Sequence, residues 1–155
     1  MRKLLAIPCA LALLAGGCGS SSGTGTTTRR SGPNLDKGAA RFAVQHEAEL
    51  ANRKFAKAWR SLHPAQQHVV SARRIASCYP RYAYPGPVTF RAKTVADVRW
   101  TVPGTGETTD AKAVTLTAKV GKKSTSFADH IVRIDGEWKW SLSEAAFRLA
   151  KAGKC

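Results

Sequence analysis

Long apolar segments are missing from this chain of 155 residues. The longest, residues 4–15, holds 12 residues and includes Pro8, whereas a helix that crosses a bilayer needs about 20 apolar residues. Closely spaced cysteines and histidines are also missing, which excludes a zinc motif. The chain has neither a Gly-x-Ser-x-Gly elbow nor a glycine-rich loop that leads into a helix, which excludes two common catalytic motifs. We therefore expect no metal and no cofactor.

Acidic residues are scarce, with 10 Asp and Glu against 25 Lys and Arg, which gives a net charge of +15. Such an excess favours an anionic partner: nucleic acid, a membrane surface or an acidic polymer. The basic residues form short doublets, such as Arg73-Arg74 and Lys122-Lys123, and no nucleic-acid-binding motif accompanies them. A hydrophobic content of 43% and this length indicate one globular domain of ordinary size.

The N-terminus has the pattern of a secretory signal peptide. Arg2 and Lys3 precede the apolar run, and small residues follow it up to Cys18. The stretch Ala15-Gly16-Gly17-Cys18 resembles a bacterial lipobox, although Ala15 stands where leucine is usual. The resemblance implies that residues 1–17 are removed and that Cys18 is lipidated, for instance with palmitate. The alternative is an ordinary secretory signal that happens to contain a cysteine.

A flexible tether is expected after Cys18. In residues 19–33, twelve of fifteen are Gly, Ser or Thr, so this segment has almost nothing to bury. We assign residues 18–37 to the lipidated cysteine and tether, and residues 38–155 to one folded domain at the extracytoplasmic face of the cell membrane. That domain holds 20 of the basic and 9 of the acidic residues. This location excludes nucleic acid and favours anionic lipid or cell-wall polymer as the partner of the charge.

The remaining cysteines form an even pair. Cys9 leaves with the signal peptide and Cys18 carries the lipid, so Cys78 and Cys155 are left in an oxidising compartment. A disulfide between them would fix the last residue of the chain to its helical half. Two free thiols are the alternative.

The first half of the folded domain is expected to be helical. Apolar residues at spacings of three and four predict one long helix over residues 35–62, with Asn34 or Asp36 as its cap. Pro64 ends it, because the residue before a proline avoids the helical conformation. Two short helices follow over residues 65–70 and 72–78, and Ser71 caps the second.

The second half alternates with a period of two and predicts four strands. The first begins at residue 88 and has a bulge near residues 94–96, where the alternation slips. Asp135-Gly136 predicts a two-residue hairpin turn, and a final helix over residues 144–150 follows Ser143. Helices followed by a meander indicate an α+β fold. We expect a long N-terminal helix and short helices packed on a bent antiparallel sheet of about four strands, in a cone-like arrangement.

These elements resemble the nuclear-transport-factor-2-like superfamily of α+β cones over roughly residues 38–150. The resemblance rests on the helix end at residues 59–64, the short helices before Cys78 and the meander that closes through Asp135-Gly136. The tether and lipobox look like those of small lipoproteins of high-GC Gram-positive bacteria. Members of the superfamily include ketosteroid isomerases, scytalone dehydratases and polyketide cyclases, which work inside the cone. None of their catalytic motifs maps onto this sequence, and homodimers through the sheet, which cone domains often form, stay an open alternative.

His130 is the one candidate catalytic residue, as a base in mid-strand. Its neighbour Asp129 lies on the opposite face of the strand, so a partner would be Asp97 or Tyr82 across the sheet. The alternative is an ordinary half-buried strand histidine. The other histidines have simpler interpretations, namely a helix cap at His63 and surface positions at His46 and His68.

The aromatic residues are either the core of a small domain or the lining of a pocket. We expect a membrane-anchored lipoprotein whose non-catalytic domain binds a small apolar ligand or an envelope partner. The alternatives are an envelope enzyme of the isomerase or hydrolase type that uses the same cavity, and an electrostatic adaptor to anionic lipid or wall polymer. The candidate pocket residues are Trp59, Tyr82, Trp100, His130 and Trp138.

Overall fold

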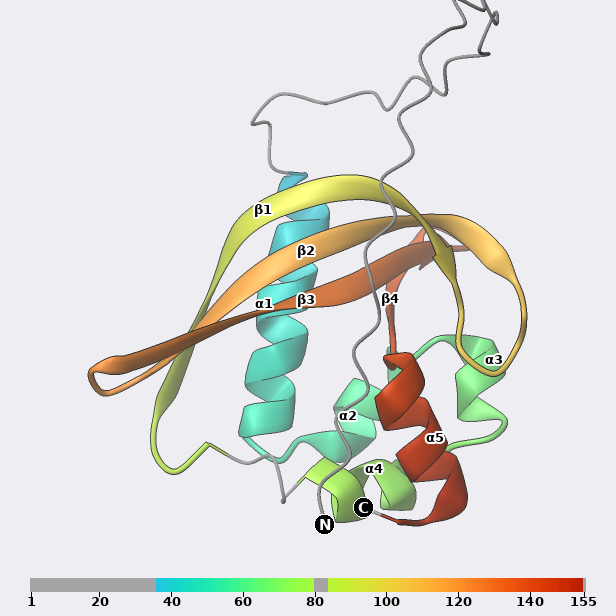
Figure 1. Cartoon of the computed structure of the whole chain (residues 1–155), viewed down its shortest axis with the longest axis horizontal. Helices are drawn as coiled ribbons and strands as arrows, with labels where there is room; N and C mark the ends of the chain where they lie inside the picture. Colours follow the sequence, from blue (N-terminus) through green and yellow to red (C-terminus); the bar gives the residue numbers. More distant parts are fainter. Residues whose placement is uncertain (1–35, 80–83, 155) are drawn as a thin grey trace, which may run out of the picture. The chain divides into compact units, whose positions relative to one another are not determined.

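The fold class is α+β, as expected. A computed structural model describes residues 36–79 and 84–154, in which five helices accompany a four-stranded antiparallel sheet. The sheet is bent, and the first helix runs along one of its faces (Figure 1). The elements are α1 (Lys37–Ala51), α2 (Phe55–Arg60), α3 (Pro64–Gln67), α4 (Ala72–Cys78), β1 (Val88–Thr101), β2 (Thr108–Val120), β3 (Lys123–Ile134), β4 (Glu137–Ser141) and α5 (Glu144–Ala152).

The prediction of a single helix over residues 35–62 is wrong. The chain forms α1 and α2, and between them Arg53 has a φ of 59°, a left-handed conformation that a right-handed helix cannot contain. The apolar periodicity continues across the break, so the sequence pattern alone does not reveal it. At the start of α1, the Asp36 side chain accepts hydrogen bonds from the backbone N–H groups of Gly38 and Ala39.

The face of α1 that packs against the sheet also differs from the predicted one. Val44 and Ala48 belong to the apolar repeat that predicts a helix over residues 35–62, but they are only half-buried. The buried face combines alanines with a histidine and a leucine, and the small alanines let the helix approach the sheet closely. Its members recur at helical spacing, at Ala39, Ala43, His46 and Leu50.

Capping residues next to the other helices determine where these helices begin. The hydroxyls of Ser71 and Ser143 accept hydrogen bonds from the first turns of α4 and α5, as predicted. His63 caps α3, with Pro64 as the first helical residue. The last helix ends at Ala152, two residues beyond its predicted end.

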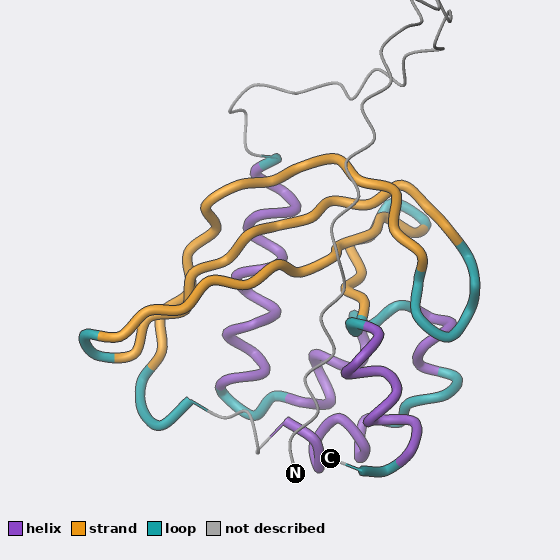
Figure 2. The backbone as a smooth tube through the Cα atoms, in the orientation of Figure 1, coloured by secondary structure: helices purple, strands orange, loops and turns teal. Residues whose placement is uncertain are grey.

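The sheet has the order β1-β2-β3-β4, so each strand pairs with the one before it (Figure 2). The register between β1 and β2 shifts between Ala92 and Thr94, which confirms the predicted bulge. The hairpin between β3 and β4 turns at Asp135 (φ 51°) and Gly136 (φ 82°), as predicted.

The core lies between the helices and the inner face of the sheet. That face carries Val114, Leu116 and Ile131, all fully buried. Polar contacts join the layers: the Trp140 indole N–H donates to the Ala58 carbonyl oxygen, and Gln66 links two distant segments. The buried Gln66 amide donates to the Pro103 carbonyl at 3.2 Å, and its carbonyl oxygen accepts from the Leu142 N–H at 2.9 Å.

Several predicted features lie outside the described residues. They are the signal peptide, the lipidated Cys18, the tether up to residue 35, Tyr82 and Cys155. Within the described residues, none of the helices combines the length and the apolar character that a membrane crossing requires.

Candidate functional site

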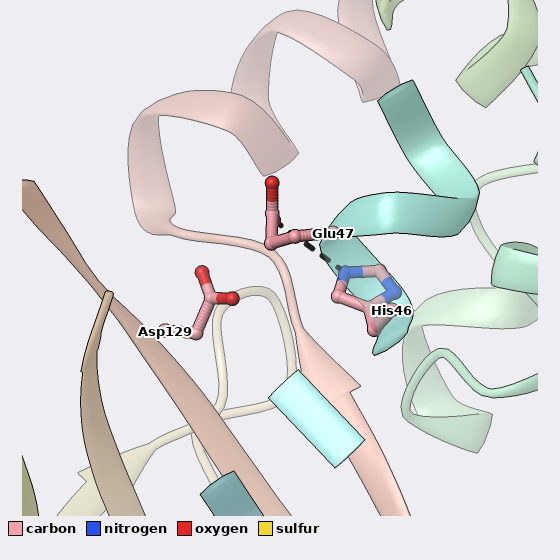
Figure 3. Close-up of side chains that lie close together, drawn as sticks. All are labelled: His46, Glu47 and Asp129. Atoms are coloured by element: carbon pink, nitrogen blue, oxygen red, sulfur yellow. Dashed lines mark ion pairs between the residues drawn. The ribbon is translucent and has the colours of Figure 1, made fainter. Parts of the chain in front are cut away.

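Two carboxyl groups lie close together between α1 and β3. Glu47 comes from the inner side of α1, and Asp129 from β3 (Figure 3). The alternation of β3 points Phe127, Asp129 and Ile131 to the same face, the one that faces the core. An acidic residue therefore stands in a position that its strand neighbours fill with apolar side chains.

Neither carboxyl has a basic partner among the described residues that carries a charge near neutral pH. The base beside Glu47 is His46, whose Nε2 lies 3.8 Å from the Glu47 Oε1 atom (Figure 3). His46 is 2% exposed, and burial lowers its pKa to about 3, so the imidazole is neutral. The prediction that His46 lies at the surface is therefore wrong.

Burial and mutual repulsion keep a proton on this pair. Burial, the nearby charge of Asp129 and hydrogen bonding to it raise the pKa of Glu47 to about 9. Burial raises the pKa of Asp129 to about 7, although hydrogen bonding with Glu47 acts in the opposite direction. Between about pH 7 and pH 9 the pair therefore holds about one proton and carries about one negative charge.

A cavity of about 400 Å³ opens beside the pair, and both carboxyls line it. Its walls come from α4, α5, β3 and β4, and they are mostly apolar. Typical apolar contributors are Ile75 on α4, Leu142, and Leu149 on α5. This volume lies within the range of small-molecule sites, about 300–1,000 Å³.

Two tyrosines add polar groups to the cavity. Tyr79 and Tyr84 line it, and burial, followed by the charges of Glu47 and Asp129, raises the pKa of both phenols. Both hydroxyls are therefore neutral near neutral pH and can donate or accept hydrogen bonds. The polar part of the cavity thus combines two carboxyls with two neutral phenols.

A metal ion is a poor match for this cluster. His46, Glu47 and Asp129 each offer one ligand atom, and these atoms lie within 4.8 Å of one another. The second ring nitrogen of a metal-bound histidine normally donates to a carboxylate or a carbonyl. Within the described part of the chain, the buried His46 Nδ1 has no hydrogen-bond partner. Its ring instead stacks on Trp140, with centroids 4.1 Å apart.

The structure places His130 away from a carboxylate partner. Its ring stacks on Trp100 at 3.5 Å, and Asp97 pairs with Lys112 instead. Burial lowers the pKa of His130. This arrangement matches the simpler interpretation, an ordinary half-buried strand histidine.

The four candidate pocket residues that the structure describes do not come together at the cavity. Of these, His130 lines it, whereas Trp138 lines a second groove of about 500 Å³ near Lys57 and Lys139. Trp100 donates to the Ser141 hydroxyl at 3.2 Å, and Trp59 to the Val70 carbonyl at 2.7 Å. Tyr82 lies outside the described residues.

The amino-acid sequence does not predict the Glu47–Asp129 pair, although one signal marks Asp129. Asp129 shares its strand face with Phe127 and Ile131, and an acidic residue on an apolar face indicates a site. Nothing comparable marks Glu47, because its burial depends on which side of α1 meets the sheet.

Cys78 is 8% exposed and lines the same cavity, but Cys155 lies outside the described residues, so their disulfide stays a prediction. One contact supports it. Gly153 lies beside the Arg74 guanidinium, where a Cβ atom would come within 2.8 Å of an arginine nitrogen. The end of α5 therefore lies against α4, the helix that carries Cys78.

A scan against protein-family models and searches of curated proteins and of solved structures each found no match to this chain. The resemblance to the nuclear-transport-factor-2-like superfamily therefore stays a proposal, and its support is the arrangement of the helices and the sheet.

Proposed function

We propose that this protein is a lipid-anchored domain, outside the cytoplasmic membrane, that binds a small molecule with a largely apolar body. The observation that supports it best is the cavity of about 400 Å³ with two carboxyls that lack a cationic partner in the described part of the chain. Apolar walls with a few convergent polar groups are the usual features of a small-molecule site.

The energetic cost of the pair supports a role in binding. Burying carboxyl groups without a basic partner destabilises a fold by several kcal/mol in typical cases. Two apolar side chains in place of Glu47 and Asp129 would make a more stable core. A destabilising arrangement that lines a cavity is more often functional than structural.

Native mass spectrometry of the lipidated protein, released from membranes in detergent, tests this proposal. We expect a co-purified small molecule whose mass adduct disappears after organic extraction. The matched control is Ala146→Trp, which fills the cavity from α5. If the wild type and Ala146→Trp carry the same adducts, or neither carries any and no library compound raises the melting temperature of the wild type, the proposal is wrong.

Proton-transfer catalysis in the same cavity is the second candidate, and the raised pKa values of Glu47 and Asp129 favour it. Paired carboxyls that titrate near neutral pH can serve as general acid and base. These two groups, rather than His130, would then carry the chemistry. Incubation of the bound molecule in heavy water distinguishes the candidates: an isomerase would exchange a carbon-bound hydrogen, and a binding protein would not.

A further inference from the structure

We infer that the Glu47–Asp129 pair recognises a protonated amine, so that the ligand of the cavity is an organic cation with an apolar body. This inference rests on the proposed function, because it names the class of small molecule that the cavity takes.

The first argument is the unused hydrogen-bonding capacity of the pair. Glu47 is 8% exposed and lines the cavity, and the Asp129 Oδ2 atom is buried with no hydrogen-bond partner among the described residues. Carboxylate oxygens only accept, and an ammonium group offers three donors. Charge-assisted hydrogen bonds of this kind are also the strong ones.

The second argument is that most of the other carboxyls have a basic partner. Glu49, also buried and also on α1, has the Lys57 ammonium 2.8 Å from its Oε1 atom. Exposed acids are paired as well: Asp110 with Arg99, and Glu137 with Lys139. Although the chain has 25 Lys and Arg, the two carboxyls in the cavity have no such partner among the residues that the structure describes. A cation that enters from outside would complement them.

The titratable groups that face the pair carry no positive charge that would repel a bound cation. The titratable side chains that face it are His46 from α1, Tyr79 from the end of α4, and Tyr84. All three are neutral near neutral pH, because burial lowers the pKa of His46 and raises those of the tyrosines. Aromatic faces next to a carboxylate also favour a cation.

The third argument is the rest of the cavity, which selects an organic cation over a metal ion. Ile75, Leu142 and Leu149 give it apolar walls, and a bare ion would leave that surface unused. An amine with a cyclic hydrocarbon body suits both the apolar walls and the polar end of the cavity. Its hydrocarbon body covers the apolar surface, and its ammonium group reaches the carboxyls.

Matched pairs of compounds test the inference by isothermal titration calorimetry on the lipidated protein in detergent. The probes are benzylamine with benzyl alcohol, tryptamine with tryptophol, and cyclohexylmethylamine with cyclohexylmethanol. For at least one pair, we expect the amine to bind at least tenfold more tightly than its alcohol near neutral pH. If no member of any pair binds, the proposed function is wrong. If amines and alcohols bind equally, the cavity binds small molecules but the inference is wrong.

Variants locate the effect. Asp129→Asn should reduce the amine affinity at least tenfold and leave the alcohol affinity unchanged. Glu49→Gln, which changes a buried carboxyl outside this cavity, should alter neither. An equal loss in both variants would overturn the inference, and so would Zn²⁺ binding that displaces the amine and needs His46.

A pH series on the wild type keeps the test independent of whether the variants fold. Because the pair loses a proton as the pH rises, the amine affinity should increase between about pH 5 and pH 8. The alcohol affinity should stay flat over the same range. An amine affinity that does not change with pH would contradict the inference.

Discussion

The Trp140 indole N–H lies 2.7 Å from the Ala58 carbonyl oxygen, to which it donates across 82 positions of sequence. The same ring stacks on His46 and is 4% exposed. This one side chain of β4 therefore contacts both α1 and α2, close to the wall that carries Glu47.

Trp140→Phe removes the donor and leaves a buried carbonyl without its partner. We expect a loss of about 1–3 kcal/mol in the free energy of unfolding, measured by urea denaturation. Trp138→Phe is the matched control two residues earlier. Trp138 is half-buried, so its substitution should cost less than about 1 kcal/mol. Equal losses would contradict the role given to this hydrogen bond.

The carboxyl pair should make the protein less stable as the pH rises. The folded-state pKa values of Glu47 and Asp129, about 9 and about 7, lie above those of the unfolded chain. Between about pH 5 and pH 9 the pair therefore binds more protons in the folded state, which outweighs the one proton that buried His46 does not bind below its unfolded pKa of 6.5. The free energy of unfolding should fall by at least about 2 kcal/mol between pH 5 and pH 8.

Urea denaturation at several pH values measures this fall, and Asp129→Asn should reduce it, while the part that comes from the burial of Glu47 remains. Glu49 provides the contrast. Burial alone would raise its pKa, but hydrogen bonds from Lys57 and Gln45 lower it. Glu49→Gln should therefore leave the fall in place. Wild-type stability that rises from pH 5 to pH 8 would show that the pair is not buried as described.

Gly104 faces the ring of Phe147 on α5. A Cβ atom there would lie 2.3 Å from two ring carbons, and its φ of 82° already disfavours other residues. Gly106 has a similar φ of 73° but open space around it. We expect Gly104→Ala to lower the free energy of unfolding by at least about 2 kcal/mol more than Gly106→Ala. Both substitutions strain the backbone at a positive φ, but only the first also displaces a core ring. Similar melting temperatures for the two variants would contradict this.

The predicted disulfide gives a fourth test. A bond between Cys78 and Cys155 closes a loop of about 77 residues, which stabilises the fold by about 4 kcal/mol in the chain-entropy model. The unreduced, denatured protein should therefore contain no titratable thiol from this pair. Cys155→Ser should lower the melting temperature by several degrees. Two reactive thiols in the wild type would rule out the bond.

Local chemistry made part of this fold predictable. The turn at Asp135-Gly136 and the caps at Ser71 and Ser143 depend on a few neighbouring residues, so the sequence carries their signals in full. The strand phase of Asp129 was predictable for the same reason, since side chains alternate along a strand.

Tertiary packing determines the features of α1 that the sequence pattern does not predict. The left-handed Arg53 interrupts a continuous apolar pattern, and α1 buries the side that carries Ala39, Ala43 and Leu50 rather than the side that carries Val44 and Ala48. This choice buries His46 and brings Glu47 next to Asp129. Glu47 and Asp129 are 82 positions apart, and their contact depends on how α1 lies on the sheet. The local spacing of residues does not predict that orientation.

The connection between the ends of the domain sets an order for its folding. Neighbouring strands are adjacent in the chain and can pair as soon as each hairpin exists. The contact between the end of α2 and the sheet depends on β4, the last strand in the chain, because Leu62 forms its bridge with Trp140 and the Ser61 carbonyl accepts from the Trp140 N–H. During synthesis, α1 can already pack against β1, its main partner in the sheet, whereas α2 gains its partner strand only when β4 has been made. A nascent chain that stops before Trp140 would therefore leave the apolar surface around Leu62 without its partner strand, and exposed apolar surface of this kind is what chaperones bind.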